Sequence, residues 1–162
     1  MAAVVTSETL VWRLKPFAVL TPAELQAIHM ARQSVFVVEQ ICPYQDADDF
    51  DCQAHHLSGW GAEQGVLLAY LRLLPPGSKY VEASLGRVIT TAAGRGRGLG
   101  KLLLEQGITE CKQLYRGHAI RISAQQYLER FYQAAGFQTV SAPYLEDNIP
   151  HIAMLRSDDK SG

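Results

Sequence analysis

The spacing of apolar residues predicts a helix near the start of the chain. Between residues 21 and 39 apolar side chains recur at helical intervals, with Arg32 as one polar interruption. The helix has a defined beginning, because Thr21 can cap it, Pro22 suits its first position and Glu24 completes a capping box. We therefore predict a helix that runs to about Glu39.

Two further helices are predicted in the second half of the chain. Residues 98–116 open with a glycine and carry one apolar face. That face consists of Leu104, Ile108, Cys111 and Tyr115. Residues 125–135 also place aromatic and apolar side chains at core spacing, and Gly136 follows where a left-handed C-terminal cap belongs.

Short apolar runs between turn residues predict the strands. They are residues 10–15, 55–60, 66–74, 81–91, 119–124, 137–144 and 149–155. An aspartate-rich loop, residues 41–53, follows the first helix. This order of elements predicts an α+β or mixed α/β fold. The 162 residues are enough for one domain over 1–162, and we expect its core at about 10–155 and a frayed polar tail at 157–162.

Composition and charge narrow the classes of partner. Hydrophobic residues make up 48% of the chain, charged residues 19%, and the net charge is −1. A nearly neutral chain lacks the basic field that drives binding to nucleic acids or anionic membranes, so neither is expected as a partner. The longest apolar stretch, residues 66–74, is too short to span a membrane and contains Arg72.

The N-terminus and the cysteines favour a cytoplasmic protein. The first twelve residues have no basic start and no long apolar core, which argues against a signal peptide. The three cysteines, Cys42, Cys52 and Cys111, form no even set for a disulfide framework. Reduced thiols are the expected state of such cysteines in the cytoplasm.

The segment Arg95-Gly96-Arg97-Gly98-Leu99-Gly100 lies between a predicted strand and a predicted helix. Glycines let the backbone approach a ligand, the free amides of a helix N-terminus bind phosphate, and arginines add charge-assisted contacts. A plain turn needs fewer glycines, and RNA-binding Arg-Gly segments occur as repeats in disordered tracts. The Lys-Ser/Thr pair of a Walker loop is missing, and the Rossmann spacing is not met.

The pattern Arg-x-x-Gly-x-Gly after a strand resembles the signature of the GNAT acyl-CoA N-acyltransferases. The helix that ends in Phe131-Tyr132 before Gly136-Phe137 resembles the second signature of that family. Gln125 stands where many members have Asn. Asn148 belongs to the turn Glu146-Asp147-Asn148, which joins the last two predicted strands. It stands where the ElaA-like branch usually has Gly, and both residue types tolerate a left-handed turn. The segments that resemble this branch are Val35–Gln40, Cys42–Tyr44, Gly86–Val88, Ala124-Gln125 and Glu146–His151.

The resemblance implies a fold and an acyl donor. The fold would be a single GNAT-like domain with a central, mostly antiparallel twisted sheet, splayed middle strands and about four flanking helices. The donor would be acetyl-CoA as a cosubstrate, and no metal is implied. Its pantetheine arm would pair with a strand and its pyrophosphate would lie in the glycine loop. The donor-binding residues carried over are Arg87, Val88, Ile89, Arg95, Gly96, Arg97, Gly98, Leu99, Gly100 and Gln125.

The implied reaction is the transfer of an acetyl group to a primary amine, by direct attack of that amine on the thioester. A backbone amide of residues 87–89 would stabilise the negative charge that develops on the thioester oxygen. Tyr132 matches the family's general acid, because a phenol can protonate a thiolate. On its position alone, Tyr132 would be a core aromatic. The acceptor would be a small-molecule or peptide-like amine.

The base and the acceptor pocket are less defined. An ammonium must lose a proton before attack, and Glu39 and His151 are the leading candidates for the group that accepts it. Further carboxylates that could serve are Glu82, Glu146 and Asp147. The candidate substrate-binding residues are Gln40, Tyr44 and Arg72, with His55 as a weaker one.

Two alternative interpretations, a metal site and a non-catalytic module, compete with this function. Cys42, Cys52, His55 and His56 include zinc-binding residue types, but the cysteine spacing is unusual and adjacent histidines on a strand point to opposite faces. The aspartates of the loop lack the Gly and Glu of an EF-hand, so no metal site is predicted.

The rival function is a non-catalytic module that binds acyl-CoA. The sequence also leaves open whether the protein forms a homodimer.

Overall fold

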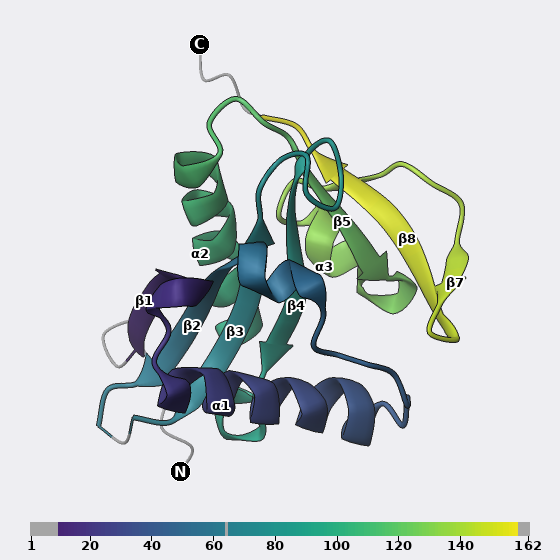
Figure 1. Ribbon diagram of the computed structural model, residues 1–162. Coiled ribbons are helices and arrows are strands. Elements are labelled where there is room, and N and C mark those ends of the chain that lie inside the picture. Colours follow the sequence, from purple (N-terminus) through teal and green to yellow (C-terminus); the bar gives the residue numbers. More distant parts are fainter. Residues whose placement is uncertain (1–9, 64, 159–162) are drawn as a thin grey trace.

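The computed structural model describes residues 10–63 and 65–158, and within them eight strands form one sheet (Figure 1). The strands are β1 (Leu10–Pro16), β2 (His55–Gly61), β3 (Leu67–Leu74), β4 (Ala83–Thr90), β5 (Ile120–Gln125), β6 (Gln138–Thr139), β7 (Tyr144–Glu146) and β8 (Ile149–Arg156). Their order is β1-β2-β3-β4-β5-β8-β6, with β7 paired to β8. All pairs are antiparallel except β4 with β5, which confirms the predicted mixed α/β fold.

The first helix begins as predicted but changes its winding before it ends. In α1 (Pro22–Arg32) the Thr21 hydroxyl accepts from the Glu24 amide at 3.1 Å, and the Glu24 carboxylate accepts from the Thr21 amide at 3.0 Å. From Gln33 to Glu39 the chain forms a π-helix rather than more α-helix. Its β-branched valines weaken the α-helical preference, and π segments are frequent at functional sites.

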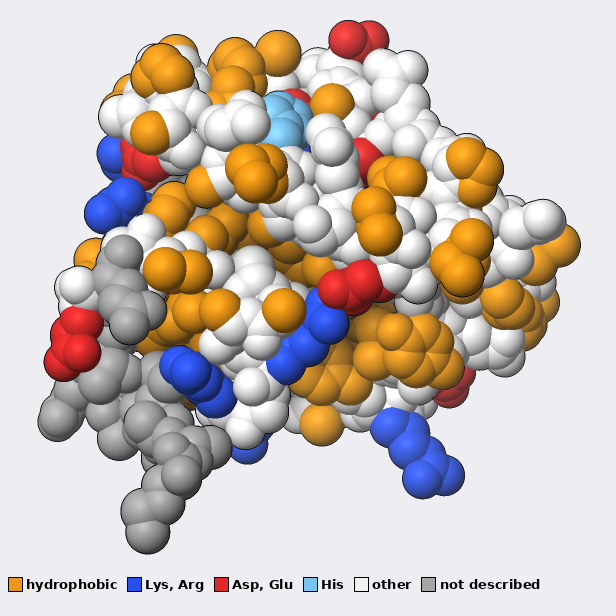
Figure 2. All heavy atoms as spheres, turned by 90° about the horizontal axis from the view of Figure 1, so that it is seen from below, with side chains coloured by type: hydrophobic (Ala, Val, Ile, Leu, Met, Phe, Trp, Pro, Cys, Tyr) orange, Lys and Arg blue, Asp and Glu red, His pale blue; other side chains and the backbone are white. Residues whose placement is uncertain are grey.

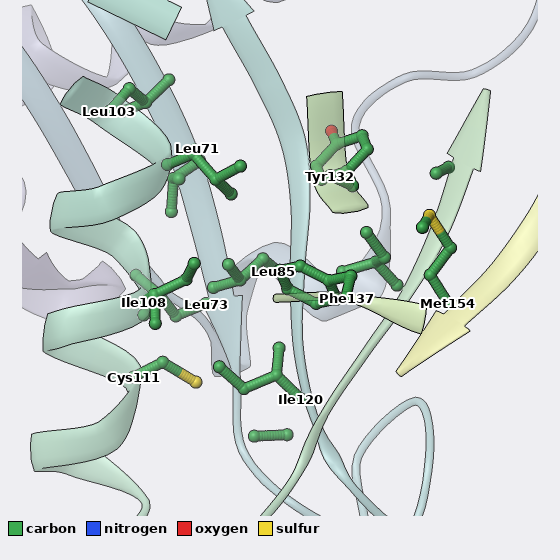
Figure 3. Close-up of a cluster of buried hydrophobic side chains, with 14 of the residues drawn as sticks. Leu71, Leu73, Leu85, Leu103, Ile108, Cys111, Ile120, Tyr132, Phe137 and Met154 are labelled. Carbon is green, nitrogen blue, oxygen red and sulfur yellow. The ribbon is translucent and has the colours of Figure 1, made fainter. Parts of the chain in front are cut away.

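Helices cover both faces of the sheet (Figure 1). On one face Ile28 of α1 packs in a cluster with Tyr70 and Ile89. On the other face, α2 (Leu99–Leu114) and α3 (Glu129–Gln133) enclose the larger core, part of which Figure 3 shows. α2 lies so close to β3 that a Cβ added at Gly107 would be 2.6 Å from Leu71 Cδ2.

The middle of the sheet is splayed, as the resemblance predicted (Figure 1). β4 and β5 pair only at Ala83–Ile120 and Ser84–Arg121, and then diverge. β4 also has a bulge, because Arg87 and Val88 together lie opposite the single Leu71 of β3. Such an extra residue bends its strand and remains outside the regular pairing.

The C-terminal part differs from the prediction in three elements. Gln125 ends β5 instead of starting a helix, and a 3-10 turn, Gln126–Leu128, precedes the short α3. The described residues contain the three α-helices that the residue pattern predicted, whereas the resemblance implied about four. The predicted strand 137–144 is divided into β6 and β7, because Pro143 cannot donate to a strand ladder.

Two predicted turns have the expected backbone. Gly136 follows α3 with φ +97°, and Asp147 and Asn148 have φ +49° and +64° in the β7–β8 turn. Among the residues that the structure describes, no helix is long and apolar enough to cross a bilayer. The expectations for residues 1–9 lie outside the described residues, as do those for 159–162.

Candidate active site

A cavity of about 500 Å³ opens where β4 and β5 separate. The π-helix and the loop after it, α3 and the β7–β8 turn complete its walls. Figure 2 views the molecule from below and shows an apolar hollow with acidic and basic side chains beside it. The predicted site residues that line the cavity are Glu39, Gln40, Tyr44, Arg87, Val88, Ile89, Arg95, Gln125, Tyr132, Glu146, Asp147 and His151.

The inner wall of the cavity is the splayed part of β4. Pairing with β5 ends at Ser84, and residues 87–89 lie beyond that point. No strand among the described residues pairs with this stretch on its β5 side. An extended ligand could therefore pair with its backbone in the way that a peptide adds a strand to a sheet edge.

The glycine loop lies at the N-terminus of α2. Gly96 and Gly98 have φ +75° and +71°, and a Cβ added at either would meet no atom within 4 Å. Gly98 is the N-cap and gives the first turn no side-chain cap, and that turn holds no acidic residue. Free amides and nearby arginines at the start of a 16-residue helix fit a pyrophosphate. The other loop residues are exposed Arg97, half-buried Gly100 and Leu99, whose side chain is buried.

Two side-chain contacts connect the π-helix region to the opposite walls of the cavity. Arg95 Nη2 lies 2.6 Å from Glu39 Oε2, and both side chains are partly exposed. Gln125 Nε2 donates to Gln40 Oε1 at 3.3 Å. The first contact pairs a base candidate with a donor-binding candidate, so Glu39 is already engaged by a cation before any ligand binds.

Tyr132 lines the cavity and also belongs to the core cluster that Figure 3 shows. Its ring is 7% exposed and packs edge-on against Phe131 and Phe137, with centroids 5.2 and 5.9 Å away. Burial, with a smaller contribution from Tyr127, raises the pKa of its hydroxyl to about 12. Tyr132 is therefore a neutral phenol at neutral pH, which is the protonation state that a general acid needs.

His151 and Glu146 lie next to each other in the cavity wall. His151 Nδ1 is 2.6 Å from the Ile149 carbonyl oxygen, which can only accept, so Nδ1 carries a proton. Its Nε2 is 3.3 Å from Glu146 Oε2. The ring also stacks on Tyr144, whose hydroxyl is 2.5 Å from Ser123 Oγ. Both ring nitrogens of His151 therefore face hydrogen-bond acceptors, the Ile149 carbonyl oxygen on one side and the Glu146 carboxylate on the other.

Arg72, a predicted substrate-binding residue, lies outside the cavity wall in a buried ion network. It is 1% exposed, and its Nη1 lies 2.6 Å from Asp48 and 2.9 Å from Asp51. Arg32 pairs with Asp46 at 2.8 Å and with Asp51 at 2.7 Å. Burial alone would raise the pKa of Asp51, but Arg32, the Asp48 amide and Arg72 hold it well below its usual range.

The remaining candidates also have partners outside the cavity. His56 Nδ1 is 2.7 Å from the Tyr70 hydroxyl, and its Nε2 is 2.9 Å from the Asp51 carbonyl oxygen. His55 Nδ1 is 3.4 Å from the Tyr115 hydroxyl, and Glu82 is 3.9 Å from Arg121. In the described part of the chain, no group of three His, Cys, Asp or Glu residues could hold a metal ion.

The sequence reasoning missed the ion network and part of the cavity wall. Arg32 on an apolar helix face, followed by four aspartates, was the available signal for a buried ion pair. Ser123 lines the cavity beside Gln125. Nothing in the sequence marked Ser123 as a site residue. Successive residues of β5 line the cavity because β4 has separated from β5 there, and that separation is visible only in the tertiary structure.

A splayed sheet beside a glycine-rich helix N-terminus is the arrangement that the resemblance implied. The chain matches the family model of the acetyltransferase (GNAT) domain over residues 26–157. It belongs to this family and is therefore, by class, an acyl-CoA-dependent N-acyltransferase.

Relatives in sequence and structure agree with this assignment. The chain is 37% identical over 147 residues to protein ElaA of Escherichia coli, covering 90% of this chain and 95% of ElaA. It is 40% identical to a UPF0039 protein of Synechocystis, over 89% of this chain and 93% of that protein. An acyl-CoA N-acyltransferase of Pseudomonas aeruginosa superposes with a TM-score of 0.86 at 44% identity, covering 91% and 99% of the two chains.

Proposed function

We propose that the protein transfers an acetyl group from acetyl-CoA to a primary amine of a small molecule or peptide. The observation that carries this proposal is the cavity in the splay, which brings a free strand edge, Tyr132 and His151 together beside the glycine loop. Each of these parts suits one step of an amide-forming transfer.

The donor would be held by backbone groups. The amides of the glycine loop, with Arg95 and Arg97, would bind the pyrophosphate, and residues 87–89 would pair with the pantetheine arm. When bound, acetyl-CoA supplies an acyl group that is already activated as a thioester, so the chain needs no nucleophile of its own. Gln125, which donates to Gln40 in this structure, is a further donor-binding candidate.

Two side chains would carry out the proton transfers, His151 as the general base and Tyr132 as the general acid. His151 Nε2 would accept the proton of the substrate ammonium, and the adjacent Glu146 carboxylate would stabilise the imidazolium that results. Tyr132 would donate its phenolic proton to the departing thiolate. An amide of residues 87–89 would stabilise the charge on the thioester oxygen. Gln40 and Tyr44 line the cavity and would contact the amine.

The test is thiol release from acetyl-CoA in the presence of a panel of primary amines, set beside thermal stabilisation by CoA alone. An enzyme should release thiol faster with at least one amine than with water, and the acetylated amine should appear in equal amount. Stabilisation by CoA without amine-dependent thiol release would instead support the non-catalytic acyl-CoA-binding module.

A further inference from the structure

Arg87 holds a backbone conformation that a side chain of its size rarely adopts. Its φ is +54°, within the left-handed region, and it lies in the β4 bulge at the cavity wall. A bulky residue in this region is an outlier that persists only when surrounding contacts hold it. The contacts of the side chain should therefore explain why the bulge forms there.

The Arg87 side chain is tied to the aspartate-rich loop. Its Nε lies 2.9 Å from Asp46 Oδ1, and its Nη2 donates to the Asp46 carbonyl oxygen at 3.0 Å. Nη2 also lies 3.3 Å from Asp48 Oδ2. The guanidinium is 5.6 Å from the ring centroid of Tyr44 and 5.9 Å from that of Phe36. Ion pairs and two aromatic faces thus hold one cation.

Two further arginines, Arg32 and Arg72, hold Asp46 and Asp48 in place. Arg32 Nε is 2.8 Å from Asp46, and both side chains are almost fully buried. Arg72 donates two hydrogen bonds to the Asp48 carboxylate, from Nη1 at 2.6 Å and from Nη2 at 2.9 Å. Because α1 and β3 hold Asp46 and Asp48 in place, these aspartates provide fixed points from which Arg87 can position β4.

We propose that Arg87 is a positioning residue, whose side chain holds the β4 bulge so that the amides of residues 87–89 face the acyl donor. This inference rests on the proposed function. Without the tether, an L-residue at position 87 would leave the left-handed region, and the bulge would relax toward regular pairing with β3. A shift of one residue redirects every group that follows it on the strand, and a misplacement of about 1 Å can slow catalysis about a hundredfold.

The experiment compares Arg87→Ala with Arg87→Gly. Both variants lose the same ion pairs, but only glycine adopts a positive φ without steric cost. We expect kcat with acetyl-CoA to fall about tenfold to a hundredfold in Arg87→Ala and to recover severalfold in Arg87→Gly, with similar melting temperatures. In crystal structures, residue 87 should keep a positive φ in the glycine variant and lose it in the alanine variant.

A second pair of variants tests the anchor. Asp46→Asn weakens the hold on Arg87 and should lower kcat more than it raises KM for acetyl-CoA. Asp49→Asn is the matched control, since it makes the same charge change at an exposed position of the same loop, and it should retain the wild-type kcat.

The inference fails if Arg87→Ala and Arg87→Gly have equal kcat values and residue 87 keeps its positive φ in both structures. It also fails if a folded Asp46→Asn variant matches Asp49→Asn in kcat. A wild-type protein that releases no thiol with any amine would overturn the proposed function alone, because the φ comparison needs no turnover.

Discussion

At the residue scale, Tyr132 fits both interpretations that its sequence position allowed, a core aromatic and a candidate general acid. Its ring packs with Phe131 and Phe137 in the core, and its side chain also lines the cavity. The same burial that makes the ring structural raises the pKa of the hydroxyl to about 12. Packing against the core therefore also keeps the proposed acid protonated.

Replacing Tyr132 with Phe should separate the two roles. The ring and its contacts remain, so the melting temperature and the affinity for CoA should change little. Turnover should fall about a hundredfold or more, because the departing thiolate loses its proton donor. The defect should shrink with a thioester whose leaving thiol is more acidic. Steady-state kinetics check this, and unchanged turnover with a rate-limiting chemical step would contradict the role.

His151 and Glu39 compete for the role of base, and matched variants distinguish them. His151→Ala should lower kcat/KM for the amine about a hundredfold, whereas Glu39→Gln should have a smaller effect because its carboxylate is paired with Arg95. The His151→Ala defect should decrease at higher pH, since more of the amine is then already neutral. A larger loss in Glu39→Gln would assign the base to the π-helix instead.

At the element scale, the two ends of α2 have the same backbone requirement but different surroundings. Gly98 before the helix has φ +71°, and Gly117 after it has φ +80°. A Cβ added at either glycine would meet no atom within 4 Å, so a side chain strains the backbone at both without a clash. Only Gly98 lies at the proposed pyrophosphate site.

Gly98→Val should therefore abolish CoA-dependent stabilisation, while Gly117→Val should retain it. CoA at a hundred times its Kd should stabilise the wild type by about 2.7 kcal/mol, which is about 5–10 °C in a domain of this size. Thermal unfolding with and without CoA measures this shift. A folded Gly98→Val protein with the full shift would show that the glycine loop does not bind the donor.

The start of α1 makes a prediction about acid stability. Burial would raise the pKa of Glu24, but the Thr21 amide, Lys15 and the Thr21 hydroxyl lower it from 4.5 to about 2. The unfolded chain therefore binds a proton that the folded chain does not, between about pH 4.5 and 2. The contribution of Glu24 to the free energy of unfolding is complete above this window and is lost as the pH falls through it.

Denaturant titrations of Glu24→Gln should show this window. The variant should be less stable than the wild type at pH 6, and the difference should shrink as the pH falls toward 2. Glu105→Gln, at an exposed position of α2, should retain the wild-type pH dependence. A constant difference between wild type and Glu24→Gln over this range would contradict the argument.

At the scale of the whole molecule, the sheet consists of two parts that meet at a short seam. β1–β4 form one part, β5–β8 form the other, and two residue pairs of β4 and β5 join them. Tyr132 and Phe137 of the second part share a core with Leu71 of the first, so packing holds the parts together where hydrogen bonds do not. The cavity is the gap that remains between the strands.

CoA should therefore protect the splayed part of β4 and β5 rather than the whole sheet. Hydrogen exchange should slow at the backbone amides of residues 85–89 and 122–125 when CoA is present, because a bound strand-like ligand shields that edge. The amides of β1 and β2 should be unaffected and serve as the internal control. Protection spread evenly over all strands, or absent at 85–89, would contradict binding in the splay.

Local sequence determined the elements whose causes lie within a few residues. The capping box of α1, Gly98 before α2, Gly136 after α3 and the left-handed β7–β8 turn were all predicted correctly. These features depend on sterics and on hydrogen bonds between near neighbours, so the residue types at fixed offsets are sufficient to specify them.

Sequence motifs identified part of the candidate site, and the tertiary structure was needed for the rest. The residues of the two signatures could be named from their pattern, and twelve of the predicted residues line one cavity. Arg72 could not be assigned from the sequence, because its partner Asp48 is 24 residues away and lies at the start of a short 3-10 helix, Asp49–Gln53, on a different part of the chain. The same limit applied to Arg87, whose contact with Asp48 spans 39 residues.

Only the tertiary structure decided where the charges of the chain meet. The sequence contained three arginines on separate elements and a loop of four aspartates, and either set could have faced solvent or a ligand. Folding brings α1, β3 and β4 against that loop, and burial then requires each charge to have a partner. Pairing over such separations depends on how whole elements pack, which no local pattern encodes.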